Sequence, residues 1–147
     1  MPTHHETRSL PYPPEKVFEL VADVERYPEF LPWCAAARIR SRATDGPVET
    51  LAADLVISFK VFRERFGSTV RLNRDAGRID TEYLDGPFKY MKSFWEIQEA
   101  EGGAKTSFFV DFEMKNIILE KAVGLMFNQA MQRIVAAFEA RAKDLYG

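Results

Sequence analysis

Cysteine and histidine are scarce in this chain of 147 residues, which contains one cysteine and two histidines. A single cysteine, Cys34, excludes an internal disulfide and fits a reducing compartment. His4 and His5 are adjacent, so a strand would point them to opposite faces, and no Cys/His/Asp cluster accompanies them. We therefore expect no metal site, and we interpret the two histidines as a tag remnant or a solvated terminus.

Long apolar runs and targeting segments are also missing. No stretch approaches the roughly 18 consecutive apolar residues of a membrane span. The beginning, PTHHETRSL, has neither the apolar core of a signal peptide nor an Arg-rich transit pattern. We expect a cytoplasmic protein that contacts a membrane only peripherally, at the inner face of the plasma membrane. A net charge of -2 also argues against DNA as a partner.

Motifs of known enzyme chemistry are absent too. The sequence has no phosphate-binding glycine loop and no GxSxG motif. Most carboxylates fall on the polar parity of predicted strands, and Glu64, on the apolar parity, has no acid–base partner. We therefore expect a binding protein without catalytic residues or a catalytic cofactor. The length fits a single domain over residues 1–147.

The last thirty residues predict one long helix. From Asn116 to Tyr146 there is no proline, and apolar residues recur at three- and four-residue steps, with Ile117 and Ile118 widening the stripe. Asn116 suits an N-cap, and Gly147 suits the end of the helix. The N-terminal half of the stripe either fills gaps in an ordinary core or covers an adaptable apolar cavity, because its side chains are soft: Met126, Phe127 and Met131.

The first 34 residues predict a strand and two short helices. His5–Leu10 is a short strand candidate that prolines end, and Pro14 suits the first position of a helix, PEKVFELVADV. Two prolines break a second helical piece, VERYPEFLP, which leads to Trp33. The apolar side chains held between these prolines would close one end of a core.

The apolar period changes to two between Ala35 and Lys115. It predicts six strands, near 35–44, 48–59, 61–74, 78–84, 90–100 and 104–115. Turn signals such as Asp45-Gly46-Pro47 separate them, so successive strands form antiparallel hairpins. One parity of each strand is apolar, and the only large apolar cover is the C-terminal helix. The sequence predicts an α+β fold with an antiparallel sheet wrapped around one helix.

Two features interrupt this pattern. Glu64 and Ser68 share the apolar parity of their strand, which indicates either a β-bulge or a solvated strand end, or polar contacts inside a hydrated or ligand-bearing cavity. The polar parity carries two groups of arginines that would form a basic stripe if their strands are close. That stripe is either a solvated face balanced by acids or a surface for anionic lipid or RNA phosphate: Arg38, Arg40, Arg42, Arg63, Arg65 and Arg71.

Four stretches carry a family resemblance: VFELVADVERYPEFLPWC at 17–34, Gly86-Pro87-Phe88, Trp95, and FEARAKDLYG at 138–147. They resemble the coenzyme Q (ubiquinone)-binding protein family of the START-like, or polyketide cyclase/dehydrase, superfamily, which includes bacterial ribosome association toxin relatives. The resemblance covers nearly the whole chain. It implies a helix-grip fold, in which a curved antiparallel sheet of about seven strands wraps around a long C-terminal helix and two short helices follow the first strand.

The same resemblance implies two alternative functions. The first is non-enzymatic binding or chaperoning of ubiquinone, or a similar isoprenoid lipid, in a hydrophobic tunnel that supports respiratory electron transport. The second is a ribosome association toxin-like role, in which the protein binds the large ribosomal subunit and blocks subunit joining. The same motifs occur in proteins of both kinds, so they do not distinguish the two functions. Eukaryotic members carry a transit peptide, so this chain is similar to the bacterial members.

Strand and helix parity predicts which residues would line such a tunnel. Burying an isoprenoid tail contributes about 0.8 kcal/mol per CH₂-sized unit, so apolar walls suffice for affinity. Ser68 and the Trp95 indole N–H are candidate contacts to quinone oxygens, and Phe30 to Trp33 and Gly86 to Phe88 would form the mouth. The predicted ligand-binding residues are Phe30, Trp33, Leu55, Ile57, Phe66, Ser68, Val70, Phe88, Trp95, Phe108, Val110, Phe112, Val123, Met126, Phe127 and Met131.

Overall fold

The computed structural model describes residues 3–59, 62–124 and 127–147. A strand and two short helices come first: β1 (Thr3–Leu10), α1 (Pro14–Ala22) and the 3₁₀ helix η1 (Val24–Glu29). Six strands follow, namely β2 (Cys34–Asp45), β3 (Val48–Phe59), β4 (Phe62–Asn73), β5 (Arg78–Asp85), β6 (Phe88–Ala100) and β7 (Gly103–Met114). Two helices complete the chain: α2 (Ile117–Gly124) and α3 (Phe127–Tyr146).

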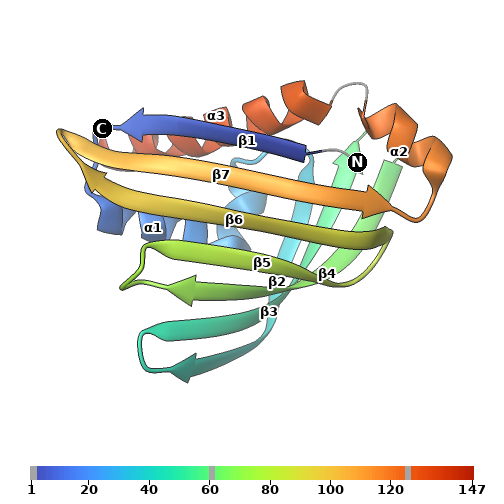
Figure 1. Ribbon diagram of the computed structural model, residues 1–147, viewed down its shortest axis with the longest axis horizontal. Helices are drawn as coiled ribbons and strands as arrows, with labels where there is room; N and C mark the ends of the chain where they lie inside the picture. The colour runs from blue at the N-terminus through green and yellow to red at the C-terminus, as the bar shows by residue number, and fades with distance from the viewer. Residues whose placement is uncertain (1–2, 60–61, 125–126) are drawn as a thin grey trace.

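The strands form one curved antiparallel sheet of seven strands in the order β1-β7-β6-β5-β4-β3-β2. Figure 1 shows the sheet bending around the helices, with α3 running beside β1. Strands β2 to β7 are joined in sequence by hairpins, and β1 closes the arrangement by pairing with β7. The predicted α+β helix-grip fold, with a seven-strand sheet and two short helices after the first strand, is confirmed.

The alternation of apolar and polar residues explains which face of the sheet is covered. In β7 every second residue from Ala104 to Met114 is buried, and the residues between them are only partly covered or exposed. Val17, Phe18 and Val21 of α1 and Phe138 of α3 belong to the same core. Pro14 opens α1, as predicted, because its missing N–H costs nothing in the first turn.

The predicted helix over 116–146 is helical on both sides of two residues that the structure does not describe. The structure describes two helical segments, and residues 125 and 126 between them lie outside the described part of the chain. Asn116 caps α2, since its side-chain oxygen accepts a hydrogen bond from the Ile118 N–H at 3.0 Å. Ile117 and Ile118 are 66% and 78% exposed, so they do not widen the buried stripe. Gly147 ends α3, as predicted.

Two irregularities in β2 change which residues share a face. The register between β2 and β3 shifts between Cys34 and Ala36, and again between Ile39 and Ser41. The second shift moves Arg42 to the opposite face from Arg40, and there it pairs with Glu25 of η1 at 3.5 Å and Glu49 at 3.3 Å. The prediction that Arg42 shares a face with Arg38 and Arg40 is therefore wrong, because a β-bulge inverts the side-chain parity.

The two histidines lie on opposite faces of β1, as predicted, but His4 is not part of a solvated terminus. Its side chain is 8% exposed. One ring nitrogen lies 3.3 Å from the Asn128 side-chain oxygen of α3, and the other lies 2.9 Å from a Glu6 oxygen. Glu6 also pairs with Arg8, which reaches Glu139 of α3 at 3.0 Å. This polar network holds β1 against the C-terminal helix.

Candidate functional site

A cavity of about 320 Å³ lies between the inner face of the sheet and helix α3. Small-molecule sites in proteins measure about 300–1,000 Å³, so the space is large enough to hold a ligand and far larger than a packing defect. Its walls come from strands β3 to β7, from the segment of η1 and the loop after it, and from one side of α3. The walls are almost entirely apolar, which suits a hydrophobic molecule.

Aromatic side chains give the cavity stiff walls. Trp95 contacts Phe108 at a centroid distance of 4.7 Å and Phe138 of α3 at 4.9 Å. A second series of edge-to-face contacts joins Phe66, Phe88, Phe112 and Phe127, with centroid distances of 5.0–5.5 Å. Such ring pairs constrain one another's orientation, which restricts the conformations of the wall.

Most of the predicted ligand-binding residues lie in the cavity wall. These are Trp33, Leu55, Ile57, Phe66, Ser68, Val70, Phe88, Trp95, Phe108, Val110, Phe112, Phe127 and Met131. Phe30 lies beside the wall instead, where its ring packs against Phe138 at 5.2 Å and Tyr27 at 6.1 Å. Met126 and the side chain of Val123 lie outside the described residues.

Sequence reasoning missed several wall residues. Tyr27 of η1 lines the cavity, donates a hydrogen bond from its phenol to the Val21 carbonyl, and has its pKa raised by burial. Thr81 of β5 and Ser93 of β6 also line it. Ser93 lies between Met91 and Trp95 on the parity already recognised as apolar, so parity alone would have found it. The remaining missed residues of this wall include Cys34, Met91, Ala130, Ile134 and Phe138.

Glu64 and Ser68 have different environments: Glu64 lies at a solvated rim, and Ser68 lies inside the cavity. The register between β3 and β4 runs without a shift from Val48–Asn73 to Phe59–Phe62, so both residues keep the inner parity. Glu64 is exposed and lies at the rim of the cavity, whereas Ser68 lies deep inside and is 2% exposed. The bulge of this region lies on the other side of β4, in its pairing with β5.

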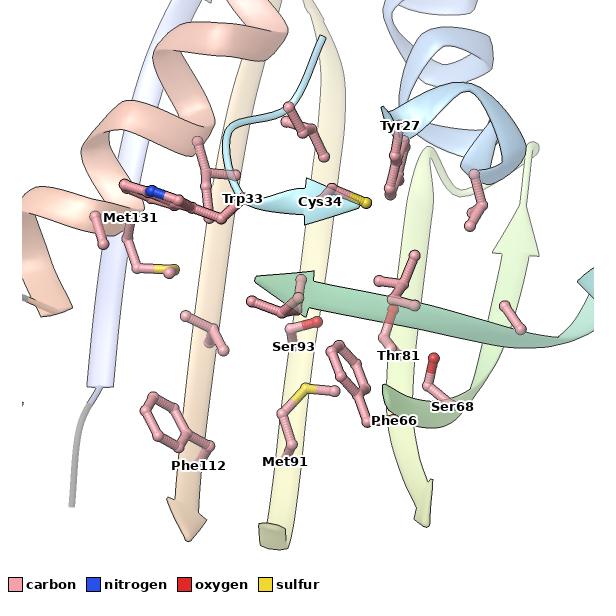
Figure 2. A pocket seen from close by; sticks show the side chains of 18 of the residues that line it. Tyr27, Trp33, Cys34, Phe66, Ser68, Thr81, Met91, Ser93, Phe112 and Met131 are labelled. Atoms are coloured by element: carbon pink, nitrogen blue, oxygen red, sulfur yellow. The ribbon is translucent and has the colours of Figure 1, made fainter. Parts of the chain in front are cut away.

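The segment after η1 forms one border of the cavity. Trp33 has a backbone φ of 65°, a left-handed conformation that bulky residues rarely adopt and that costs of order 1–3 kcal/mol. Its carbonyl accepts a hydrogen bond from the Ser58 N–H at 2.8 Å, which helps to hold this conformation. Figure 2 shows the Trp33 indole beside Met131 of α3, with Cys34 next to it. Burial raises the pKa of the Cys34 thiol.

The outer face of the sheet is not a continuous basic stripe. Arg40 pairs with Asp54 at 3.1 Å, Arg65 with Asp54 at 2.7 Å and Asp85 at 3.2 Å, and Arg71 with Glu82 at 3.8 Å. These acids balance most of the arginines. Arg38 and Arg63 are exposed, and neither has an ion-pair partner among the described residues. Lys92 of β6 and Lys105 of β7 are also exposed on this face and have no ion-pair partner among the described residues, so the free positive charge comes from two arginines and two lysines.

Other kinds of site find no support in the part of the chain that the structure describes. Within 3–59, 62–124 and 127–147, no group of three His, Cys, Asp or Glu side chains is placed to hold a metal ion. Over the same residues, no helix has the length and apolar character needed to cross a membrane.

Comparison with known proteins agrees with this geometry. Residues 10–139 match the family model described as polyketide cyclase / dehydrase and lipid transport. Ribosome association toxin RatA of Rickettsia prowazekii is 42% identical over 142 residues, which covers 95% of this chain and 94% of that protein. Mitochondrial coenzyme Q-binding protein COQ10 homolog B of Xenopus laevis is 26% identical and aligns with 98% of this chain and 59% of its own length.

A solved structure shows the same architecture. The solution structure of an 18 kDa protein from Caulobacter crescentus superimposes with a TM-score of 0.84 at 36% identity, and covers 100% of this chain and 99% of that chain. The fold, the apolar cavity and the whole-chain similarity agree, and the resemblance that the sequence predicted is confirmed. The chain belongs to the polyketide cyclase/dehydrase and lipid transport family and is a START-like lipid-binding module.

Proposed function

We propose that the protein associates with the large ribosomal subunit and blocks subunit joining, in the manner of a ribosome association toxin. The observation that carries the proposal is the 42% identity to the Rickettsia RatA protein over 95% of the chain. The similarity runs along nearly the whole length of both chains, since it covers 95% of this chain and 94% of the Rickettsia protein. The ribosome offers RNA phosphates, which bind exposed arginine side chains.

Two arginines of the outer face are suitable cations. Arg38 on β2 and Arg63 on β4 are both exposed, and within the described residues neither is neutralised by an acid. The other arginines of this face are held in ion pairs with nearby acids, namely Asp54, Asp80, Glu82, Asp85 and Glu96. Among the arginines of this face, phosphate contacts are therefore expected to depend mainly on Arg38 and Arg63, and the dependence of binding on salt is expected to be moderate.

Cosedimentation with purified large subunits at increasing KCl tests this function. The bound fraction should fall as salt rises, and Arg38→Glu combined with Arg63→Glu should release the protein at a salt concentration where the unmodified protein stays bound. Lys121→Glu combined with Lys143→Glu reverses the same number of charges at exposed positions of α2 and α3 and is the matched control. Absence of cosedimentation at low salt would refute ribosome association. Equal binding by the double variant would exclude this face as the contact.

The second candidate function is binding of ubiquinone or a similar isoprenoid lipid in support of respiratory electron transport. It is favoured by the apolar cavity of about 320 Å³ and by the similarity to the Xenopus coenzyme Q-binding protein. The volume is small for a long isoprenoid chain, so we expect the ring and the first isoprene units inside and the rest of the tail outside. Transient contact of a cytoplasmic protein with the inner face of the plasma membrane would then deliver the lipid.

Lipid extraction and mass spectrometry of gently purified protein test this second function. The unmodified protein should carry a quinone, and Val70→Lys should lose it, because the lysine places an ammonium in the apolar wall. Lys143→Glu alone serves as the control, since it lies on the exposed side of α3. Equal quinone content in Val70→Lys and the control would remove the cavity as the binding site.

Both candidate functions are non-enzymatic, and this part of the proposal has its own support. Among the described residues of the cavity wall, Glu64 at the rim is the only carboxylate, and no histidine or lysine accompanies it. General acid–base catalysis normally needs a second group with a matched pKa within hydrogen-bond reach. We therefore expect the bound lipid to leave the cavity chemically unchanged.

A further inference from the structure

Three hydroxyl side chains form a row across the wall of the cavity. They are Ser68 of β4, Thr81 of β5 and Ser93 of β6, and all three line the cavity. Thr81 lies directly opposite Ser93 in the β5–β6 register, and Ser68 lies opposite Tyr83, two residues along β5 from Thr81. Figure 2 shows the three side chains on one face of neighbouring strands. Since adjacent strands are about 4.8 Å apart, the row extends about 10 Å.

These hydroxyls have no protein partner. Within the described part of the chain, none of the three makes a side-chain hydrogen bond, although the Ser68 side chain is only 2% exposed. None of the three is among the fully buried side-chain atoms that lack a partner, so the hydroxyls open onto the cavity, where a molecule bound in an apolar space must satisfy them or leave them unfavourably unpaired. A row of free hydroxyls aimed into an apolar cavity therefore indicates a ligand that carries polar atoms at matching positions.

The charge of the wall limits what that ligand can be. Glu64 is the only charged side chain among the described wall residues, and it lies exposed at the rim. The described wall contains no lysine, arginine or histidine. A ligand with a buried carboxylate or phosphate would find no counter-ion, and burying an unpaired charge is strongly unfavourable.

We infer that Ser68, Thr81 and Ser93 select neutral lipids whose ring carries oxygen atoms, against fatty acids and against pure hydrocarbons. The inference rests on the proposed binding of a lipid in this cavity. A hydroxyl both donates and accepts hydrogen bonds, so it pairs with a ring carbonyl as an O–H donor and with a ring hydroxyl as an acceptor. The row therefore accepts a quinone and its reduced quinol with affinities within about tenfold of each other.

Intrinsic fluorescence provides the assay, because both tryptophans of the chain, Trp33 and Trp95, line the cavity. Decylubiquinone is titrated directly, and palmitate and decylbenzene are measured by competition against it. In the unmodified protein, palmitate and decylbenzene should bind at least tenfold more weakly than decylubiquinone. Ser68→Ala, Thr81→Val and Ser93→Ala should each weaken decylubiquinone about two- to tenfold, the range expected for one lost hydrogen bond.

Two controls separate this inference from the function on which it rests. Thr69→Val removes a hydroxyl from the neighbouring residue of β4, which has the outward parity, and should leave all three affinities unchanged. Decylbenzene affinity should be unchanged or stronger in the three cavity variants, since they make the wall more apolar. The three substitutions keep side-chain shape and lie on three strands, so one poorly folded variant leaves two independent tests.

The outcomes are distinguishable. If the unmodified protein binds none of the three compounds, lipid binding itself fails and the inference fails with it. If it binds decylubiquinone and the Ser68, Thr81 and Ser93 variants bind equally well, lipid binding stands and the selective role of the row is overturned. If palmitate binds as tightly as decylubiquinone, selection of neutral ligands is overturned.

Discussion

Filling the cavity by mutation tests whether the hollow beneath α3 exists in solution. Val110 lies in its wall and is 8% exposed, so Val110→Phe directs a larger side chain into empty space. The ring adds about four CH₂-sized units at about 0.8 kcal/mol each, an upper limit near 3 kcal/mol. The side-chain entropy lost when the ring is ordered, and an imperfect fit of the ring to the cavity, both reduce this gain. The free energy of unfolding is therefore expected to rise by about 1–2 kcal/mol.

The same substitution in the dense part of the core should have the opposite effect. Val17 of α1 is 1% exposed and borders a void of only about 20 Å³, which has room for about one water. Val17→Phe therefore forces its neighbours apart and should lower the free energy of unfolding by about 1–3 kcal/mol. The matched pair separates the effect of the cavity from the general effect of a valine-to-phenylalanine change.

Urea unfolding at 25 °C, followed by tryptophan fluorescence, gives both free energies, and thermal unfolding should show a rise of about 2–8 °C for Val110→Phe. Decylubiquinone binding should weaken in the same variant, because the ring occupies ligand space. If Val110→Phe destabilises the protein as much as Val17→Phe does, the space beneath α3 is filled in solution. The lipid-binding assignment would then lose its physical basis.

Three further predictions concern the scaffold around the cavity. Gly103→Ala should lower the free energy of unfolding by about 3 kcal/mol or more, because a Cβ there overlaps the Leu10 carbonyl oxygen. Gly102→Ala meets open space and should lower it by about 1–2 kcal/mol, because its backbone is left-handed. Urea unfolding compares the two variants, and equal losses would contradict the close approach of Gly103 to Leu10. Burial raises the pKa of the Cys34 thiol, so its thiolate fraction at pH 8 lies below that of a free cysteine. Iodoacetamide should therefore modify Cys34 slowly in the folded protein, and the rate should increase as the pH rises. In denaturant the rate should equal that of a free cysteine. Asn116→Ala should destabilise α2 by about 0.5–2 kcal/mol and speed amide exchange there but not in α3; unchanged exchange in α2 would show that the cap contributes nothing.

The sequence predicted the strands well because two local signals agree there. Period-two alternation marks the six strands, and turn residues such as Asp45 and Gly46 mark the hairpin between β2 and β3. The predicted boundaries lie within two residues of the observed ones. The same alternation predicted most of the cavity wall, because the residues on the inner face of a curved sheet are also the residues that face the helix.

Features that depend on tertiary contacts were beyond the same reasoning. The shift between Ile39 and Ser41 leaves no mark in the composition of β2, so the reversal of Arg42 was not predictable from alternation. Thr81 and Ser93 are different, because alternation places both on the inner parity of their strands and is enough to predict them. The ion pairs of Arg40 and Arg65 with Asp54 depend on the register between neighbouring strands, which cannot be read from the sequence.

The pairing of β1 with β7 has a consequence for how the protein is made. Thr3 and Asp111, which face each other across these strands and share a hydrogen bond, are 108 positions apart in the chain. At a translation rate of about 5–20 residues per second, the first strand waits about 5–20 s before its neighbour is synthesised. Throughout that interval its backbone groups are unpaired, so this segment is the one that a nascent-chain chaperone has the longest opportunity to bind.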